Sequence, residues 1–211
     1  MIITIGRELG SGGRKIGKLV AEELGLPFYD KELLSEAAKK SGLTQECFER
    51  ADERARHDLG VGLFGFRFPF LGDASAPIVP GFSNDTIFQF QSDTIRTIVE
   101  ESPLGCVFVG RCANYVLRDK NPFNVFISAT EDSRVKRIVS YFNCSEKEAK
   151  EWIKKIDKQR AAYYDFYTSV KWGEAKNYHL SLNSSALGED SCVRLIVQSA
   201  KAFYANLGEK K

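Results

Sequence analysis

The sequence has no strong excess of charge of either sign. It contains 30 Lys and Arg residues against 28 Asp and Glu residues, so its formal net charge is +2. Domains that bind nucleic acid usually have a pI above ~9, whereas the pI of this chain is about 8.2. We therefore expect no nucleic-acid partner, and any function that uses positive charge must concentrate that charge locally.

Motifs for metal binding and nucleophilic catalysis are also missing. The five cysteines are scattered and odd in number, without a CxxC pair or a Cys/His cluster, which argues against a zinc site. His57 and His179 have no Ser, Cys or carboxylate partner at a telling spacing, so we interpret both as structural or exposed. There is no nucleophile elbow and no paired-histidine motif. We expect a reduced protein whose side chains form no metal site by themselves.

The sequence lacks a hydrophobic run long enough to cross a bilayer. Its most apolar stretch, residues 60–82, is interrupted by Arg67, Asp73 and three prolines. The chain begins directly with a strand-like run at residues 2–5, so we expect no signal peptide. These features predict a cytoplasmic protein with no membrane partner.

What the sequence does contain is an alternation of strand-like and helical segments. Its 211 residues, 43% hydrophobic and 27% charged, have the composition of an ordinary globular domain. Apolar runs without polar alternation are separated by segments with helical spacing, which is typical of a parallel α/β sheet covered by helices on both faces. The predicted strands are residues 2–5, 27–29, 104–109, 124–128 and 178–183.

Local signals predict where several helices begin and end. Gly25 is placed to end the helix that follows the first strand. Ser128 with Glu131, and Ser145 with Glu148, have the spacing of a capping box ahead of two later helices.

Two segments depart from the strand–helix rhythm. Residues 44–82 combine a charged helix with a Gly/Phe/Pro-rich loop, and residues 131–167 form a helix pair. We interpret both as insertions at the edge of a single domain, whose core comprises residues 1–43, 83–130 and 168–211.

A glycine-rich loop joins the first strand to the first helix. In such a loop the backbone N–H groups converge, and the start of the helix adds the positive end of its dipole. Arg14 and Lys15 fall in the first helical turn, where acidic residues are usually preferred, so they are better explained as facing a phosphate. The predicted phosphate-binding residues are Gly10, Ser11, Gly12, Gly13, Arg14 and Lys15. The alternative is a tight turn with incidental charges.

This loop departs from the regular GxxxxGK[ST] motif. Gly13 stands where the lysine is expected, so Arg14 or Lys15 would have to replace that lysine. The Ser or Thr that binds magnesium is missing from its expected place, and Ser11 is only a weak substitute.

Six sequence blocks follow one another along nearly the whole chain. They are ITIGRELGSGG at 3–13, GLPFYDKELL at 25–34, QS at 91–92 with Arg96, VGRC at 109–112, DKQR at 157–160 with YY at 163–164, and LNSSALG at 182–188. In this order they resemble the cytidylate kinase-like family, P-loop proteins related to nucleoside monophosphate (NMP) kinases. The resemblance implies a five-stranded parallel sheet, an NMP-binding insertion at 44–82 and a phosphate-covering lid at 131–167.

Polar residues at the ends of the predicted strands are candidates for binding the acceptor. Asp30 ends the second strand, and Gly110 and Arg111 follow the third. Ligands of open parallel sheets bind outside the carboxyl ends of the strands, and arginine forks suit phosphate. We therefore predict an acceptor site that also includes Arg96, which lies in a helix. Asp30 as a plain N-cap and Arg96 in a surface ion pair are the alternatives.

The second insertion concentrates positive charge. Residues 131–160 hold nine basic and six acidic residues, so this segment carries +3. Arg160 falls on the apolar stripe of Ile153 and Ile156 and needs a partner there, either Asp157 or a ligand phosphate. With the resemblance, the predicted catalytic residues are Arg160, Arg134 and Arg111, and the predicted lid residues are Asp157 and Lys158.

The resemblance implies an ATP-dependent phosphotransferase that uses Mg²⁺ and acts on a nucleoside monophosphate, with CMP or dCMP first. Val109 and Cys112 stand where cytidylate kinases carry acids, so we expect the metal to be held mainly by phosphates and water. A non-catalytic nucleotide- or phosphate-binding module, and a kinase for another small metabolite, remain alternatives.

The apolar loop at 60–82 is costly to expose, so we expect it to cover the acceptor or to dock on a second subunit in a homo-oligomer.

Overall fold

The computed structural model describes residues 1–30 and 84–208. The predicted insertion at 44–82, with its charged helix and the apolar loop at 60–82, lies outside the described residues. Within the described ranges, no helix has both the length and the apolar character that a membrane span requires.

The centre of the fold is a sheet of five parallel strands in the order β2-β3-β1-β4-β5, which confirms the predicted architecture. β1 lies in the middle, paired with β3 on one side and with β4 on the other. The outer strands are β2, beside β3, and β5, beside β4. The bounds are Ile2–Arg7 for β1, Phe28–Tyr29 for β2, Cys106–Val109 for β3, Phe123–Ser128 for β4 and Leu180–Asn183 for β5.

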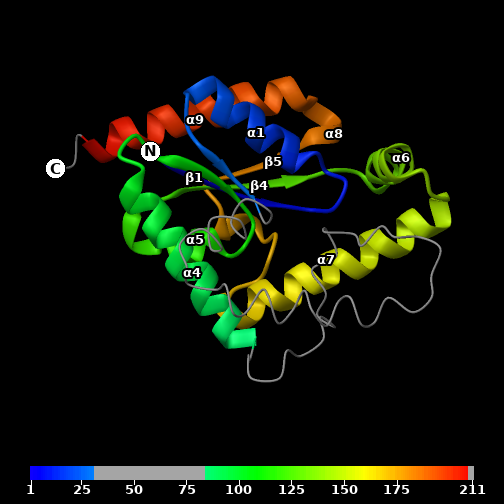
Figure 1. The fold of residues 1–211 in the computed structure, drawn as a ribbon. Coiled ribbons are helices and arrows are strands. Elements are labelled where there is room, and N and C mark those ends of the chain that lie inside the picture. Colours follow the sequence, from blue (N-terminus) through cyan, green and yellow to red (C-terminus); the bar gives the residue numbers. More distant parts are fainter. Residues whose placement is uncertain (31–83, 209–211) are drawn as a thin grey trace.

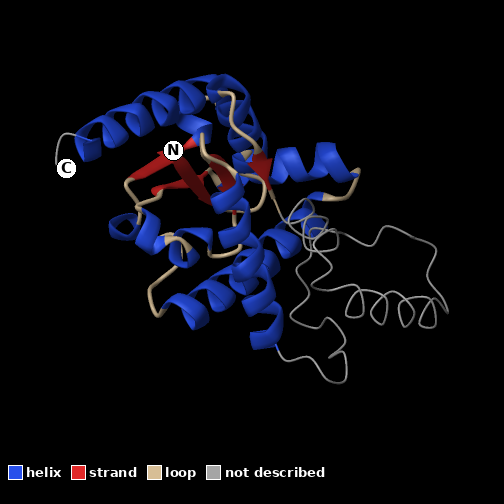
Figure 2. Cartoon of the chain, turned by 60° about the vertical axis from the view of Figure 1, so that its left-hand side comes forward, coloured by secondary structure: helices blue, strands red, loops and turns tan. Residues whose placement is uncertain are grey.

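Helices cover both faces of this sheet because alternate residues of its central strands are buried on opposite sides. Ile3 and Ile5 pack with α1 (Gly13–Leu24) and α9 (Glu189–Gly208). Ile2 packs instead with α4 (Asn84–Glu101) and α5 (Ala113–Val116). Figure 1 shows α1 and α9 on one side of the sheet and α4 and α5 on the other, and Figure 2 shows the strands enclosed between helices.

The helix pair expected at 131–167 forms a separate small apolar cluster. Its helices are α6 (Glu131–Phe142) and α7 (Glu146–Thr168), which lie together beyond the carboxyl end of β4 (Figure 1). Their buried side chains, such as Val135 and Ile153, pack around Leu9 of the glycine loop. The loop therefore contributes to the core of the helix pair.

One of the two predicted capping boxes is confirmed and the other is wrong. Ser145 and Glu148 form the reciprocal hydrogen bonds of a capping box at the start of α7. The N-cap of α6 is Thr130 rather than Ser128. Ser128 is the last residue of β4, and its hydroxyl donates to the carbonyl of Leu182 on β5. The Ser128 hydroxyl is therefore engaged with the neighbouring strand and does not cap the helix that follows.

The remaining described elements are short. They are the 3₁₀ turns η1 (Arg118–Lys120) and η2 (Ala175–Asn177), and α8 (Ser184–Leu187). Gly25 ends α1 as predicted, in a left-handed conformation with φ of 63°.

Candidate active site

The glycine loop runs from the end of β1 to the start of α1. Gly10 and Gly12 have φ of +76° and +79°, which is a left-handed conformation that favours glycine. Gly12 is the N-cap of α1 and supplies no side-chain cap, and the first turn of the helix contains no acidic residue. The positive end of the α1 dipole therefore meets the loop without a capping carboxylate from its own turn, as in anion-binding helix starts.

Ser11 is fully buried inside this loop. Its hydroxyl donates to the carbonyl of Glu8 at 2.9 Å and accepts from the N–H of Gly13 at 3.4 Å. Its own carbonyl accepts a hydrogen bond of 2.6 Å from the Ser184 hydroxyl. Ser11 therefore stabilises the conformation of the loop through hydrogen bonds of both its side chain and its backbone.

The two cations at the start of α1 both have carboxylate partners. The Nε of Arg14 lies 2.6 Å from Oδ2 of Asp30, the buried acid at the end of β2. The Nζ of Lys15 lies 2.7 Å from Oε2 of Glu189, the first residue of α9. This hydrogen bond, together with the charge of Glu189, raises the pKa of Lys15. The structure thus brings together a predicted phosphate ligand, Arg14, and a predicted acceptor ligand, Asp30.

Arg134 and Asp157 hold the helix pair against the glycine loop. Arg134 is buried, and its Nε donates to the carbonyl of Leu9 at 2.7 Å. Asp157 accepts from the N–H of Leu9 at 2.9 Å and forms an ion pair with Arg134. Nη1 of Arg134 also lies 3.4 Å from Oε2 of Glu8. Nη1 of Arg137 donates to the carbonyl of Gly10 at 3.1 Å. This network fixes the path of the loop backbone from the side of α6 and α7.

Arg160 lies beside the same network and connects α7 to the end of β1. Its Nη1 donates to the carbonyl of Arg7 at 2.9 Å and lies 3.7 Å from Oδ1 of Asp157. Burial lowers the pKa of Arg160 to about 10; Asp157 opposes this change, whereas the charges of Arg134 and Arg111 add to it. The guanidinium is therefore held in a desolvated, electropositive position.

Arg111 approaches this position from the end of β3. Gly110, Arg111 and Cys112 all have positive φ, of 83°, 58° and 53°. Three consecutive left-handed residues are a source of backbone strain, which often occurs at binding sites. Nη1 of Arg111 donates to Oε1 of Gln91 at 3.3 Å, and the hydroxyl of Tyr163 donates to the same oxygen at 3.3 Å. Burial raises the pKa of Tyr163, although the charge of Arg111 opposes that rise.

Arg7 is the site residue that the sequence reasoning missed. It is the last residue of β1, and its Nε is buried without a hydrogen-bond partner. Burial lowers its pKa well below the usual value, and the charges of Arg160 and Arg111 lower it further. The sequence carries a signal for this residue, because a cation directly follows the apolar part of the first strand.

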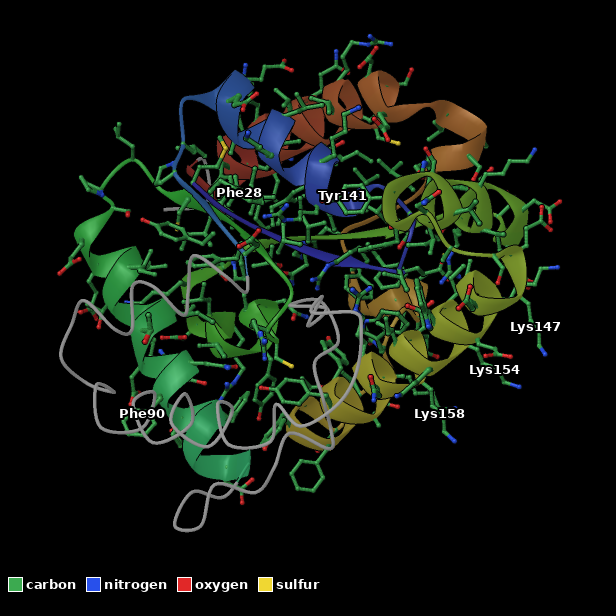
Figure 3. The ribbon with its side chains drawn as sticks, turned by 45° about the vertical axis from the view of Figure 1, so that its right-hand side comes forward. Phe28, Phe90, Tyr141, Lys147, Lys154 and Lys158 are labelled. Atoms are coloured by element: carbon green, nitrogen blue, oxygen red, sulfur yellow. The ribbon has the colours of Figure 1, made fainter. Side chains whose placement is uncertain are left out.

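Two other predicted residues lie outside this network. Arg96 is partly exposed, and its Nη1 lies 3.3 Å from Oδ1 of Asp119 in a surface ion pair, which is the alternative to acceptor binding. Lys158 is also exposed, and in Figure 3 it points away from the molecule, like Lys147 and Lys154 of the same helix.

The described residues offer no ready-made metal site. No group of three or more His, Cys, Asp or Glu side chains within 1–30 and 84–208 could hold a metal ion. Burial raises the pKa of Cys112 to about 12, so its thiol is neutral at physiological pH and a poor ligand.

Together, the all-parallel sheet, the glycine loop between β1 and α1, and a helix pair docked on that loop define the fold of the P-loop kinases. The chain belongs to the cytidylate kinase-like family, whose profile matches residues 2–186. No curated protein matches the sequence.

Three solved structures illustrate what the fold is similar to. The crystal structure of an uncharacterized protein from Eubacterium ventriosum ATCC 27560 has a TM-score of 0.68 and 29% identity, covering 94% of this chain and 97% of that chain. Shikimate kinase from Bacteroides thetaiotaomicron has a TM-score of 0.52 and 15% identity, covering 97% and 98%. A gluconokinase from Sinorhizobium meliloti 1021 has a TM-score of 0.52 and 14% identity, covering 100% and 97%. At these identities the two kinases establish a shared fold only.

Proposed function

We propose that this protein transfers a phosphoryl group from ATP to a small acceptor, with a nucleoside monophosphate such as CMP or dCMP as the first candidate. The observation that carries the proposal is the gathering of Arg7, Arg111 and Arg160 beside the glycine loop. Like charges that are desolvated together disfavour one another. A bound phosphate would be attracted by all three, and phosphoryl transfer depends mainly on positioning and charge neutralisation.

The donor phosphates would bind to the backbone of residues 10–13 and to the start of α1. Arg160 on α7 and Arg111 after β3 would then face the migrating group from two sides. Mg²⁺, held by phosphate oxygens and water, would neutralise charge on the donor phosphates. Arg134 and Asp157 would keep the loop in shape while the packed helix pair excludes water.

The acceptor would bind on the side of Arg111. Gln91 and Tyr163 are joined to Arg111 through one amide oxygen and form a polar surface there. Membership of a cytidylate kinase-like family favours a pyrimidine nucleotide. The shikimate kinase and gluconokinase of similar fold favour a second candidate, a small hydroxylated metabolite.

The departures of the glycine loop keep a third candidate open, a nucleotide-binding module without catalysis. It is favoured by Gly13 at the lysine position and by the ion pairs that engage Arg14 and Lys15. The test must therefore separate binding from turnover.

The decisive experiment measures MgATP affinity by calorimetry and ADP formation with a panel of acceptors. The panel contains CMP, dCMP, UMP, AMP, shikimate and gluconate, and a sample without acceptor measures background hydrolysis. We expect ADP formation above background with one nucleotide and little with the others. Turnover with a metabolite alone would support the second candidate. Tight MgATP binding without turnover for any acceptor would support the binding module, and no MgATP binding would contradict all three.

A further inference from the structure

Position 13 is closed to any side chain by Arg7. A Cβ built on Gly13 would lie 2.6 Å from Cβ and 3.0 Å from Cγ of Arg7, and 3.4 Å from Cβ of Ile127 on β4. The first of these separations is shorter than real Cβ atoms show. A lysine at position 13 and the present side chain of Arg7 therefore cannot coexist, and the stem of Arg7 lies where the lysine side chain would begin.

The guanidinium of Arg7 extends from this point to the end of β3. A Cβ on Gly110 would overlap Nη1 of Arg7 and lie 3.0 Å from its Cζ. Gly110 thus makes room for the arginine head, next to Arg111. The Arg7 side chain spans from the start of α1, on the donor side of the proposed site, to the strand end on the acceptor side.

The charge of Arg7 is not matched by a carboxylate in the described part of the chain. Its side chain makes no hydrogen bond or ion pair there, and its buried Nε has no partner. Asp30 and Asp157 act on its pKa from a distance, but their effect is outweighed by burial and by the charges of Arg160 and Arg111. Asp30 is engaged with Arg14, and Asp157 with Arg134 and the N–H of Leu9.

We propose that Arg7 replaces the missing P-loop lysine and binds the terminal phosphate of a nucleoside triphosphate between the glycine loop and Arg111. An arginine stays charged despite its lowered pKa and offers two parallel N–H donors to phosphate oxygens. This inference rests on the proposed function for the identity of the donor. The competing explanation is that Arg7 only fills space beside Gly13.

The two explanations predict different effects of removing the charge while keeping the stem. A desolvated cation without a counterion costs stability in the unliganded protein. Arg7→Met should therefore keep or raise the melting temperature of the free protein, as is common for side chains kept for binding. If Arg7 only fills space beside Gly13, Arg7→Met keeps the atoms that do so and would leave MgATP affinity unchanged.

The test compares Arg7→Met, Arg7→Gln and Arg7→Lys with the wild type in MgATP titrations by calorimetry. We expect the first two variants to bind MgATP about 10- to 100-fold more weakly, the effect of losing hydrogen bonds to a charged group, and Arg7→Lys to recover part of the loss. Arg118→Met is the matched control, because Arg118 is exposed and stacks on Tyr115. It should leave MgATP affinity unchanged.

Unchanged MgATP affinity in Arg7→Met and Arg7→Gln would overturn the inference, as would a lower melting temperature that Arg7→Lys does not restore. If the wild type does not bind MgATP, the proposed function fails instead. Titration with inorganic pyrophosphate then tests the anion site alone. Binding to the wild type that is lost in Arg7→Met supports the site, and equal or absent binding overturns it.

Discussion

At the scale of single residues, the arginines around the glycine loop differ in how they are held. Arg14 and Arg134 are paired with Asp30 and Asp157. Burial lowers the pKa of both Arg7 and Arg160, and the charge of Arg111 adds to the lowering of each. The charge of Arg160 lowers the pKa of Arg7 further. Arg14 and Arg134 therefore help to hold the site in shape, and under the proposed function Arg7, Arg111 and Arg160 would face the bound phosphates.

Replacing Arg160 tests whether this group acts in turnover. Arg160→Ala should lower turnover at least about 100-fold, because a positioned donor acts mainly on charge in the transition state. MgATP affinity should change little. The melting temperature should fall only slightly, through loss of the hydrogen bond to the carbonyl of Arg7.

The control is Lys154→Ala, an exposed residue of the same helix. Turnover and thermal melting are measured on the same purified preparations. A large fall in melting temperature with normal turnover per folded molecule would show that Arg160 is structural.

Arg134→Ala should have the opposite signature. Removing one partner of a largely buried ion pair leaves Asp157 with only the longer contact to Arg160 and frees the carbonyl of Leu9, at a cost of about 3 kcal/mol in the free energy of unfolding. Urea denaturation followed by circular dichroism measures this cost. Arg137→Ala is the comparison, because Arg137 is less buried and makes a single hydrogen bond to the loop. Equal stabilities of the two variants would show that the Arg134 network does not hold the loop.

At the scale of elements, the helix pair and the glycine loop depend on each other. Leu9 packs inside the apolar cluster of α6 and α7, and its backbone is held by Arg134 and Asp157. The conformation of the loop is therefore set by helices that begin more than a hundred residues later in the chain. A substitution that alters the packing of α7 should therefore also alter the conformation of the glycine loop.

The two serines predicted as caps provide a direct comparison. Ser145→Ala should lower the free energy of unfolding by about 1 kcal/mol, the usual effect of losing an N-cap. Ser128→Ala removes a 3.3 Å hydrogen bond to Leu182 but no helix cap, so it should cost less. Urea denaturation of both variants checks the order. A larger cost for Ser128→Ala would mean that the contact between β4 and β5 is worth more than the cap of α7.

At the scale of the whole molecule, metal dependence should belong to the reaction and not to the fold. The described residues contain no group of three or more acids, cysteines or histidines that could hold a metal, and under the proposed function the metal is bound mainly by the nucleotide phosphates. Excess chelator should abolish ADP formation and leave the melting temperature of the free protein unchanged. Full activity in chelator would contradict the phosphotransferase proposal, whereas chelator-induced loss of stability would reveal a structural metal.

Much of the fold was predictable because its signals are local. Apolar runs marked the three inner strands β1, β3 and β4, since a central parallel strand buries both of its faces. Gly25 ended α1, and Ser145 with Glu148 began α7, because each acts within one turn of its own helix. Ser128 failed as a cap because its hydroxyl found a partner on β5, a contact made across the sheet.

The site was predictable in position but not in its pairings. The sequence by itself determined that a glycine loop follows the first strand and that arginines come near it, because residue order and strand ends decide these features. Only the tertiary structure decided that Asp30 pairs with Arg14 and that Asp157 pairs with Arg134. It also left Arg7 beside Gly13 and Gly110 without a carboxylate among the described residues. The physical reason is that electrostatic partners depend on distance and burial in three dimensions, which the order of residues does not contain.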